Sequence, residues 1–134
     1  MPYLADTSAW HWSGRVADRW SALLEADQIA TCAPVALELL FSARSPSDHD
    51  DLAENLDGLG WVSSSRASDE AARRSQAALA ERSQHRGATP VDILVAALAE
   101  SHSLVLLHYD RHLDLIARAT GQPAEWLARR GSLR

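Results

Sequence analysis

The sequence predicts a three-layer α/β domain in which helices flank a mostly parallel sheet of four or five strands. Short apolar runs recur along the chain, helical patterns lie between them, and no repeat, linker or low-complexity tract interrupts the order. Strands that alternate with helices pair in parallel through right-handed crossovers, so helices cover both faces of the sheet. At this length the whole chain, residues 1–134, is expected to form one compact domain.

Apolar runs bounded by turn or capping residues predict the strands. Four of them are Tyr3–Ala5, Ile29–Ala33, Leu59–Ser63 and Leu104–His108. The stretch AEWL, residues 124–127, is a candidate fifth strand at the edge of the sheet.

The segments between the strands carry helix start and stop signals. Proline is favoured in a first helical turn, as at the start of Pro34–Arg44, and Thr89 with Pro90 begins another helix in the same way. Gly87 is a stop signal for a long alanine-rich helix. The predicted helices are Pro34–Arg44, Asp51–Leu59, Ser68–Arg86, Thr89–His102 and His112–Ala119.

Composition limits the classes of protein to consider. The chain has 46% hydrophobic residues, a net charge of −5, and one cysteine. This cysteine, Cys32, is expected to be an inert core thiol. No apolar run is long enough to span a bilayer, and a cytoplasmic protein fits these features. The negative charge disfavours nucleic-acid binding unless an acidic metal site supplies part of it. All basic side chains other than histidine are arginine, whose planar fork suits phosphate.

Four acidic residues are predicted to converge on one rim of the sheet. Asp6 and Asp110 each follow a strand, Asp92 lies in the first turn of a helix, and Glu38 lies about one turn into another helix. In an open parallel sheet, ligands bind outside the carboxyl ends of the strands, and the helices that follow these strands begin at the same edge. We therefore expect all four carboxylates at this edge.

Each acid also has a purely structural interpretation. Asp6 could accept hydrogen bonds from the amides of a following helix, a role that Thr7 or Ser8 could share. Asp92 fits a capping box begun by Thr89, and Asp110 could simply end a strand.

Glu38 favours the functional interpretation most strongly. Its helical neighbours are Pro34, Val35, Phe41 and Ser42, which form a largely apolar face. If that face were buried, an unpaired carboxylate would cost several kcal/mol or take up a proton, and a nearby cation would remove this penalty.

Clustered carboxylates repel one another unless positive charge lies between them. Oxygen ligands without cysteine or histidine suit Mg²⁺ or Mn²⁺ better than zinc. Such ions polarise phosphoryl oxygens and activate water, so phosphodiester hydrolysis is the chemistry that the pattern favours.

Four stretches together resemble the PIN-domain nucleases, and among them the VapC toxins of bacterial toxin–antitoxin pairs: YLADTSAW, PVALELLFSAR, TPVDILVAALAE and LVLLHYDRHLDLIA. They span nearly the whole chain. The resemblance implies an endoribonuclease that binds Mg²⁺ or Mn²⁺ through Asp6, Glu38, Asp92 and Asp110 and cuts single-stranded or structured RNA. Relatives cut transfer, ribosomal or messenger RNA. The resemblance also implies a homodimer and a VapB antitoxin whose C-terminal segment covers the acidic groove.

The resemblance further places a supporting hydroxyl, from Thr7 or Ser8, beside the first acid. Many relatives carry an acid or an asparagine two residues after the fourth acid, where this chain has His112. This difference puts a second metal ion in question. Asp114 is a further acid, expected at an exposed position.

Several arginines and tryptophans are candidates for contacts with RNA or a partner. Arg73, Arg74 and Arg111 are possible RNA contacts, although a helix that mixes arginine with glutamate is more often an ordinary solvated face. Arginines near the C-terminus could form part of the same basic margin or a loose tail. For Trp12 and Trp20 the alternatives are packing on the sheet and contact with a partner.

Two other functions share parts of this pattern. An aspartate-based phosphatase would also place an aspartate after the first strand, but it usually needs a second aspartate at position 8 and a lysine, and this chain has Ser8 and no lysine. A non-catalytic module would use the acids to dock an arginine-bearing partner and would need no metal.

Overall fold

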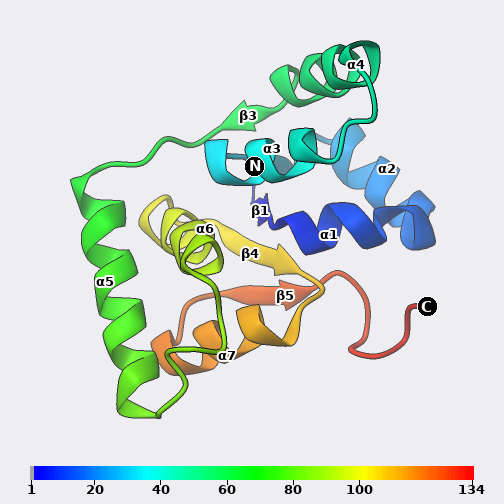
Figure 1. Ribbon diagram of the computed structural model, residues 1–134. Coiled ribbons are helices and arrows are strands. Elements are labelled where there is room, and N and C mark those ends of the chain that lie inside the picture. The colour runs from blue at the N-terminus through cyan, green and yellow to red at the C-terminus, as the bar shows by residue number, and fades with distance from the viewer. Residues whose placement is uncertain (1) are drawn as a thin grey trace.

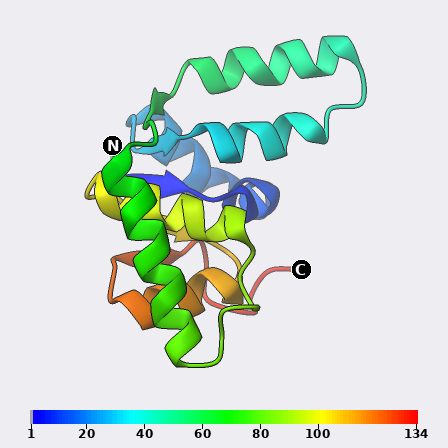
Figure 2. The ribbon, with the colours of Figure 1, turned by 60° about the vertical axis from the view of Figure 1, so that its left-hand side comes forward.

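The computed structural model describes residues 2–134, which form a five-stranded parallel sheet with helices on both faces (Figures 1 and 2). The strands are β1 (Tyr3–Ala5), β2 (Ile29–Thr31), β3 (Gly60–Trp61), β4 (Val105–His108) and β5 (Ala124–Trp126). Their order is β3-β2-β1-β4-β5, so β1 lies at the centre and the AEWL stretch supplies an edge strand. The predicted α/β class with a parallel sheet is confirmed.

Parallel pairing brings the carboxyl ends of the central strands together. Tyr3 of β1 is in register with Ile29 of β2 and with Val105 of β4, and Ala5 is in register with Leu107. The amide of Asp6 extends the ladder by donating to the carbonyl of Leu107 at 2.9 Å. The residues that follow β1 and β4 therefore emerge side by side.

Local capping signals define the helices. Ser45, Ser65 and Thr89 each accept a hydrogen bond from an amide in the first turn of the helix that follows. Gly121, with a φ of 76°, ends the last helix. The helices are α1 (Thr7–Trp12), a 3₁₀ turn η1 (Ser13–Val16), α2 (Ala17–Glu25), α3 (Ala33–Phe41), α4 (Pro46–Asp57), α5 (Arg66–Glu81), α6 (Pro90–Ser101) and α7 (Arg111–Thr120).

Two predicted helix boundaries were wrong by five residues, and α3 ends at Phe41, three residues before the predicted Arg44. Helix α4 begins at Pro46 rather than Asp51, because Ser45 caps it and proline occupies its first turn. Helix α5 ends at Glu81 rather than Arg86, because the chain turns at Ser83, which adopts a φ of 56° without a glycine. The predicted stop at Gly87 therefore comes too late.

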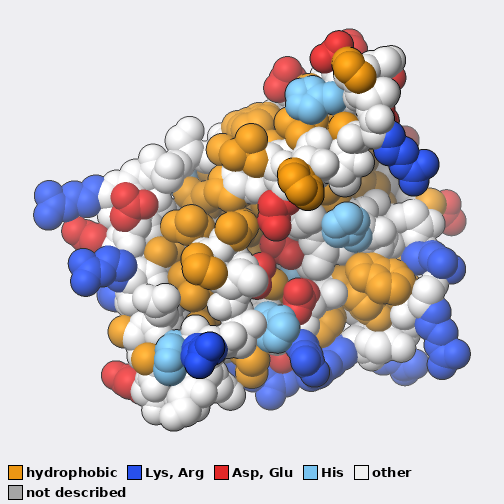
Figure 3. Space-filling model, in the orientation of Figure 1, with side chains coloured by type: hydrophobic (Ala, Val, Ile, Leu, Met, Phe, Trp, Pro, Cys, Tyr) orange, Lys and Arg blue, Asp and Glu red, His pale blue; other side chains and the backbone are white. Residues whose placement is uncertain are grey.

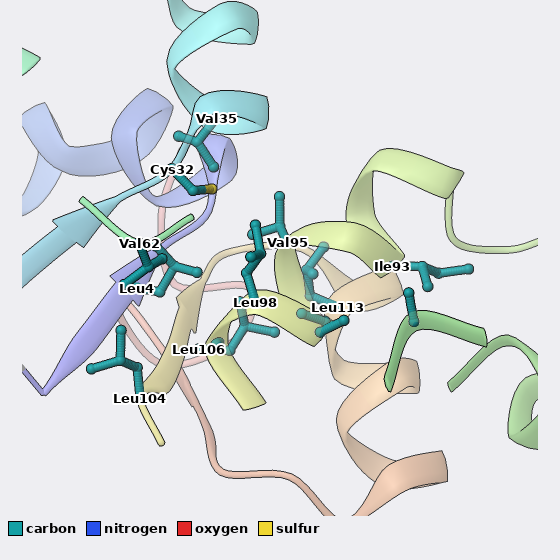
Figure 4. Packing of buried hydrophobic residues seen from close by; sticks show 14 of the residues in the cluster. Leu4, Cys32, Val35, Val62, Ile93, Val95, Leu98, Leu104, Leu106 and Leu113 are labelled. Carbon is teal, nitrogen blue, oxygen red and sulfur yellow. The ribbon is translucent and has the colours of Figure 1, made fainter. Parts of the chain in front are cut away.

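Alternation along the strands divides the core between the two faces of the sheet. Leu4 and Leu106 face a large cluster formed with α3, α5, α6 and α7, part of which is shown in Figure 4. Ala5 and Leu107 face a smaller cluster with α1 and α2, where Trp20 is buried. This is the two-residue period of a half-buried strand repeated on neighbouring strands.

Helices α3 and α4 form an antiparallel pair at one end of the molecule (Figure 2). The face of α3 that carries Leu37 and Phe41 is not covered, and these side chains are 67% and 92% exposed. No helix among residues 2–134 is both long and apolar enough to cross a membrane.

Candidate metal and catalytic site

The four predicted acids come from four different elements that meet at the carboxyl edge of the sheet. Asp6 precedes α1 and Asp110 precedes α7, each as the N-cap residue. Asp92 lies in the first turn of α6, and Glu38 lies in the second turn of α3. Figure 3 shows acidic side chains gathered in a short row across the middle of this face, between hydrophobic patches.

Asp6 is the most enclosed of the four acids, with 4% of its surface exposed. Its Oδ2 accepts hydrogen bonds from the amide of Ser8 at 3.0 Å and from the Ser8 hydroxyl at 2.7 Å. Its Oδ1 is buried and has no hydrogen-bond partner among residues 2–134. Burial raises the pKa of Asp6, the bonds from Ser8 oppose this change, and the negative charges of Glu38 and Asp110 add to it.

Glu38 interacts electrostatically with Asp6 but is exposed, so the burial penalty that favoured its functional interpretation does not apply. Its Oε1 accepts a hydrogen bond from the Thr7 hydroxyl at 2.8 Å. The apolar face on which Glu38 lies is real, but the rest of the chain leaves it open to solvent. It forms a groove of about 620 Å³ whose walls include Thr7, Leu37, Glu38, Phe41 and Val91.

Asp92 and Asp110 carry out the capping roles that sequence reasoning offered as alternatives. Asp92 Oδ2 accepts from the amide of Thr89 at 3.0 Å, while Thr89 accepts from the amide of Asp92, which completes a capping box. Burial raises the pKa of Asp92, and the charges of Asp6 and Asp110 raise it further. Asp110 Oδ1 accepts from the amide of His112 at 2.8 Å.

Each of the four acids commits only one carboxylate oxygen to the protein. Within residues 2–134, hydrogen bonds reach Asp6 Oδ2, Glu38 Oε1, Asp92 Oδ2 and Asp110 Oδ1, and none reaches the second oxygen of any of them. The side chains are close enough for their charges to interact, yet no three His, Cys, Asp or Glu side chains of the described chain form a closed ligand set. The four acids therefore converge, but their side chains do not form a complete set of metal ligands.

A residue that sequence reasoning treated only as a helper links the two central strands at the site. The Ser8 hydroxyl donates to Asp6 and accepts from the amide of Tyr109 at 2.9 Å. It therefore fixes the end of β1 against the end of β4. Thr7, the other predicted hydroxyl, instead bonds Glu38.

His108 was not predicted as part of the site. It is buried at the end of β4, and its Nδ1 accepts from the amide of Asp110 at 3.2 Å. Burial lowers the pKa of His108, although Asp114 and Asp110 partly oppose this effect. The sequence signal that could have identified His108 is its place at the end of an apolar strand, two residues before an acid.

The two residues after Asp110 that were singled out have definite contacts. We call Asp6, Glu38, Asp92 and Asp110 the acid row. His112 Nδ1 lies 3.4 Å from Asp110 Oδ1, so this histidine borders the acid row. Asp114 was predicted to be exposed, which is wrong, because its side chain is only 18% exposed and pairs with Arg118 at 2.9 Å.

The arginines predicted to contact RNA lie at different distances from the acids. Arg111 directly follows Asp110. Arg73 lines a depression between α5 and the first turn of α6, whereas Arg74 lines one between α5 and the C-terminal ends of α6 and α7. Only Arg111 is adjacent to the acid row in the chain.

The C-terminal arginines do not belong to a loose tail. Leu127 is fully buried, and its amide donates to the carbonyl of His108 at 2.7 Å. Further along, the amide of Leu133 donates to the hydroxyl of Tyr109 at 2.9 Å. The segment after β5 is held against the end of β4 at both points.

The expected inert thiol and the tryptophans also have clear positions. Cys32 is fully buried, and burial raises its pKa to about 11. Trp20 packs edge-on against Trp10 in the core, while Trp12 is half-buried and lies 5.2 Å from the ring of Tyr109. Packing explains Trp20.

Comparison with known proteins gives a consistent match. The PIN-domain family matches residues 3–119. The chain is 43% identical over 137 residues to Ribonuclease VapC18 of Mycobacterium tuberculosis, covering 99% of this chain and 100% of the relative. It is 38% identical over 135 residues to Ribonuclease VapC51 of the same organism, covering 99% and 98%.

Solved structures share the fold at lower identity. One is VapBC-1 from nontypeable Haemophilus influenzae, with a TM-score of 0.75 and 18% identity over 95% of this chain and 98% of that one. Another is a DNA-bound VapBC from Salmonella typhimurium, with a TM-score of 0.73 and 16% identity over 96% and 99%.

Proposed function

The chain belongs to the PIN-domain family, and from this premise we propose that it is a VapC-type toxin: a metal-dependent endoribonuclease that a cognate antitoxin neutralises. The mycobacterial proteins that it resembles over nearly its full length are named as ribonucleases. The proposed reaction is hydrolysis of phosphodiester bonds in RNA.

One observation supports a metal site more than any other. Four acids at one rim each leave an oxygen uncommitted, and one of these oxygens, Asp6 Oδ1, is buried without a donor. A buried carboxylate oxygen with no partner is costly, and a hard cation is a partner that four negative charges can share. The residues present therefore fit Mg²⁺ or Mn²⁺.

We assign the metal-binding role to Asp6, Glu38, Asp92 and Asp110. A bound ion of this kind would polarise a phosphoryl oxygen and supply an activated water. Ser8 orients Asp6 through two hydrogen bonds, and Thr7 orients Glu38 through one. Asp92 and Asp110 are oriented by the helices that they begin.

The helix starts also explain how the acids tolerate one another. Asp6, Asp92 and Asp110 lie at the N-terminal ends of helices, where backbone amides and the helix dipole favour negative charge. This partial compensation reduces the repulsion between the neighbouring carboxylates. It leaves their second oxygens available to an ion and a substrate phosphate.

The proposed partners are an RNA substrate, a VapB-type antitoxin and a second copy of the chain. The uncovered groove that carries Leu37 and Phe41 runs beside Glu38, so an apolar antitoxin segment bound there would also block the acids. The VapBC structures that share this fold support such a pairing. Cytoplasmic RNA is the expected target.

A non-catalytic acidic dock is the second candidate. The lack of a closed set of metal ligands among the His, Cys, Asp and Glu side chains of residues 2–134 favours this alternative. It differs from the first proposal in needing no metal and in leaving RNA intact.

Cleavage of RNA by purified protein separates the two functions. We expect Mn²⁺-dependent cleavage that EDTA abolishes, and at least a roughly hundredfold loss in Asp6→Asn and in Asp92→Asn, because each removes a charge from the ion's site. Asp51→Asn, which neutralises an exposed aspartate on α4, is the matched control. Full-rate cleavage by both site variants would refute the metal mechanism, and intact RNA with the wild type would favour the acidic dock.

A further inference from the structure

A small cavity lies next to the acid row, on the side of α7. It measures about 330 Å³, and its walls include Gly87, Arg111, His112, Asp114, Arg118 and Arg130. Arg111 follows Asp110 directly, so their Cα atoms are about 3.8 Å apart. His112 forms a wall of the cavity and also contacts Asp110. The cavity and the acid row are therefore neighbours on one face.

The charge of this cavity is opposite to that of the acid row. Arg118 is neutralised by Asp114, which lies 2.9 Å away. Arg111 and Arg130 have no carboxylate within ion-pair distance anywhere in residues 2–134. In a chain with a net charge of −5, two unpaired arginines in one cavity mark a local anion site.

Aromatic packing holds one of these arginines in place. The guanidinium carbon of Arg130 lies 5.6 Å from the centre of the Trp126 ring. Trp126 in turn packs against His108 at 4.7 Å and edge-on against Tyr109 at 5.6 Å. An arginine stacked in this way loses less side-chain freedom when it binds a phosphate.

The backbone around Arg130 is also fixed. The carbonyl of Leu127 accepts a hydrogen bond from Arg19, and the amide of Leu127 bonds to β4. The amide of Leu133 bonds to Tyr109 on the other side. Arg130 therefore lies between two anchored points rather than at the end of a flexible tail.

We propose that this cavity is a subsite for a backbone phosphate of the RNA strand, next to the phosphate that is cut. Arg111 and Arg130 bind it, and Trp126 positions Arg130. This inference rests on the proposed ribonuclease function and adds a binding site and the C-terminal segment to it. An acidic centre repels a polyanion, so a positive subsite beside it supplies attraction where the strand must approach.

The test measures binding of a short fluorescein-labelled oligouridylate by anisotropy, over a range of NaCl concentrations, with EDTA present to prevent cleavage. We expect Arg111→Ala and Arg130→Ala each to weaken binding roughly five- to tenfold. Each should also reduce the slope of log K against log salt by about 0.7, the value for one phosphate contact on a single strand.

Two further variants distinguish a subsite from a general effect of charge. Arg66→Ala removes the same charge at the start of α5, where Arg66 pairs with Glu70, and should leave the salt slope unchanged. This end of α5 lies at the upper left of Figure 1, away from α7 and the C-terminal segment. Trp126→Leu keeps every charge but removes the ring beneath Arg130. It should weaken binding in the wild-type background and have no additional effect in Arg130→Ala, and circular dichroism checks that it folds.

The outcomes separate this inference from the proposed function. If the wild type cleaves RNA but Arg111→Ala and Arg130→Ala bind like Arg66→Ala, the subsite is wrong and the nuclease stands. If the variants lose binding as expected but the wild type cuts no RNA with Mn²⁺, the phosphate subsite stands and the nuclease assignment fails. Unchanged RNA binding in all variants would overturn the proposal and would favour an acidic protein partner as the ligand of the cavity.

Discussion

Replacing Asp6 by asparagine should stabilise the protein in the absence of metal. The carboxamide oxygen of Asn can accept both hydrogen bonds from Ser8, so the local geometry is preserved. The substitution removes a buried charge that Glu38 and Asp110 repel. The new amide group replaces the orphaned Oδ1 and is uncharged, so the repulsion from the two neighbouring carboxylates is removed.

The size of the effect follows from the orphaned oxygen. A buried polar atom without a partner costs about 1–3 kcal/mol, and we expect about 1 kcal/mol to be recovered because the amide is itself only partly satisfied. An unfolding entropy of about 2.1 cal/mol/K per residue gives about 0.28 kcal/mol/K for 134 residues. The expected rise in Tm is therefore about 4 °C in EDTA.

Adding Mn²⁺ should reverse the order of the Tm values of the wild type and Asp6→Asn. At a Mn²⁺ concentration ten times its Kd, the wild type gains about 1.4 kcal/mol, or about 5 °C, and the variant gains little because it has lost the most enclosed ligand. Thermal scans in EDTA and in Mn²⁺ measure both effects. Asp51→Asn, an exposed position on α4, should change neither.

The pH dependence gives a separate check on the cause. Because folding raises the pKa of Asp6 above 3.8, its favourable contribution is fully present below that pH and is lost as pH rises through the folded-state pKa. The advantage of the variant should therefore be absent near pH 4 and grow toward neutrality. A variant that unfolds earlier than the wild type in EDTA at pH 7, or an equal response of both proteins to Mn²⁺, would refute the reasoning.

Three other predictions concern the surroundings of the acids. Ser8→Ala removes a donor to Asp6 and the acceptor of the Tyr109 amide, so urea unfolding should show a loss of about 1–2 kcal/mol and cleavage should slow; unchanged stability would exclude this linking role. Since burial lowers the pKa of His108 from 6.5, its contribution to stability is present above that pH and is lost as pH falls through the folded-state value. His108→Asn should therefore flatten the decline in unfolding free energy below pH 6.5, and an identical pH profile would contradict this. Phe41→Ser should change stability by no more than about 0.5 kcal/mol because the ring is 92% exposed, but should weaken antitoxin binding measured by calorimetry; unimpaired binding would exclude that groove.

Much of the fold was predictable because strands and helix starts are encoded locally. The first strand, Tyr3–Ala5, was predicted to the residue, since an apolar run ends there at a capping aspartate. The helix that begins after Thr89 was also predicted, because proline and a capping box are local signals. The end of α5 was not, because Ser83 adopts a positive φ that its residue type does not encode.

Within the site, residue types and the rim were predictable but exposure was not. Sequence periodicity correctly placed Glu38 on an apolar face of α3, yet it cannot show whether another element covers that face. For Asp114 the predicted exposure was too high, because the side chain pairs with Arg118 and is only 18% exposed. Burial depends on tertiary contacts, which a helical pattern alone does not specify.

The structural and functional interpretations of the acids turn out to be compatible. A capping aspartate needs one oxygen for the amides of its helix, and the cap itself orients the side chain, as at Asp6, Asp92 and Asp110. When helices begin at the carboxyl edge of a parallel sheet, the remaining oxygens share that edge. Capping then performs the positioning that the proposed metal site requires, and the helix dipoles reduce the repulsion between the carboxylates. The feature that capping does not explain is the buried, unpartnered oxygen of Asp6, because a cap exposed to solvent would serve the helix equally well.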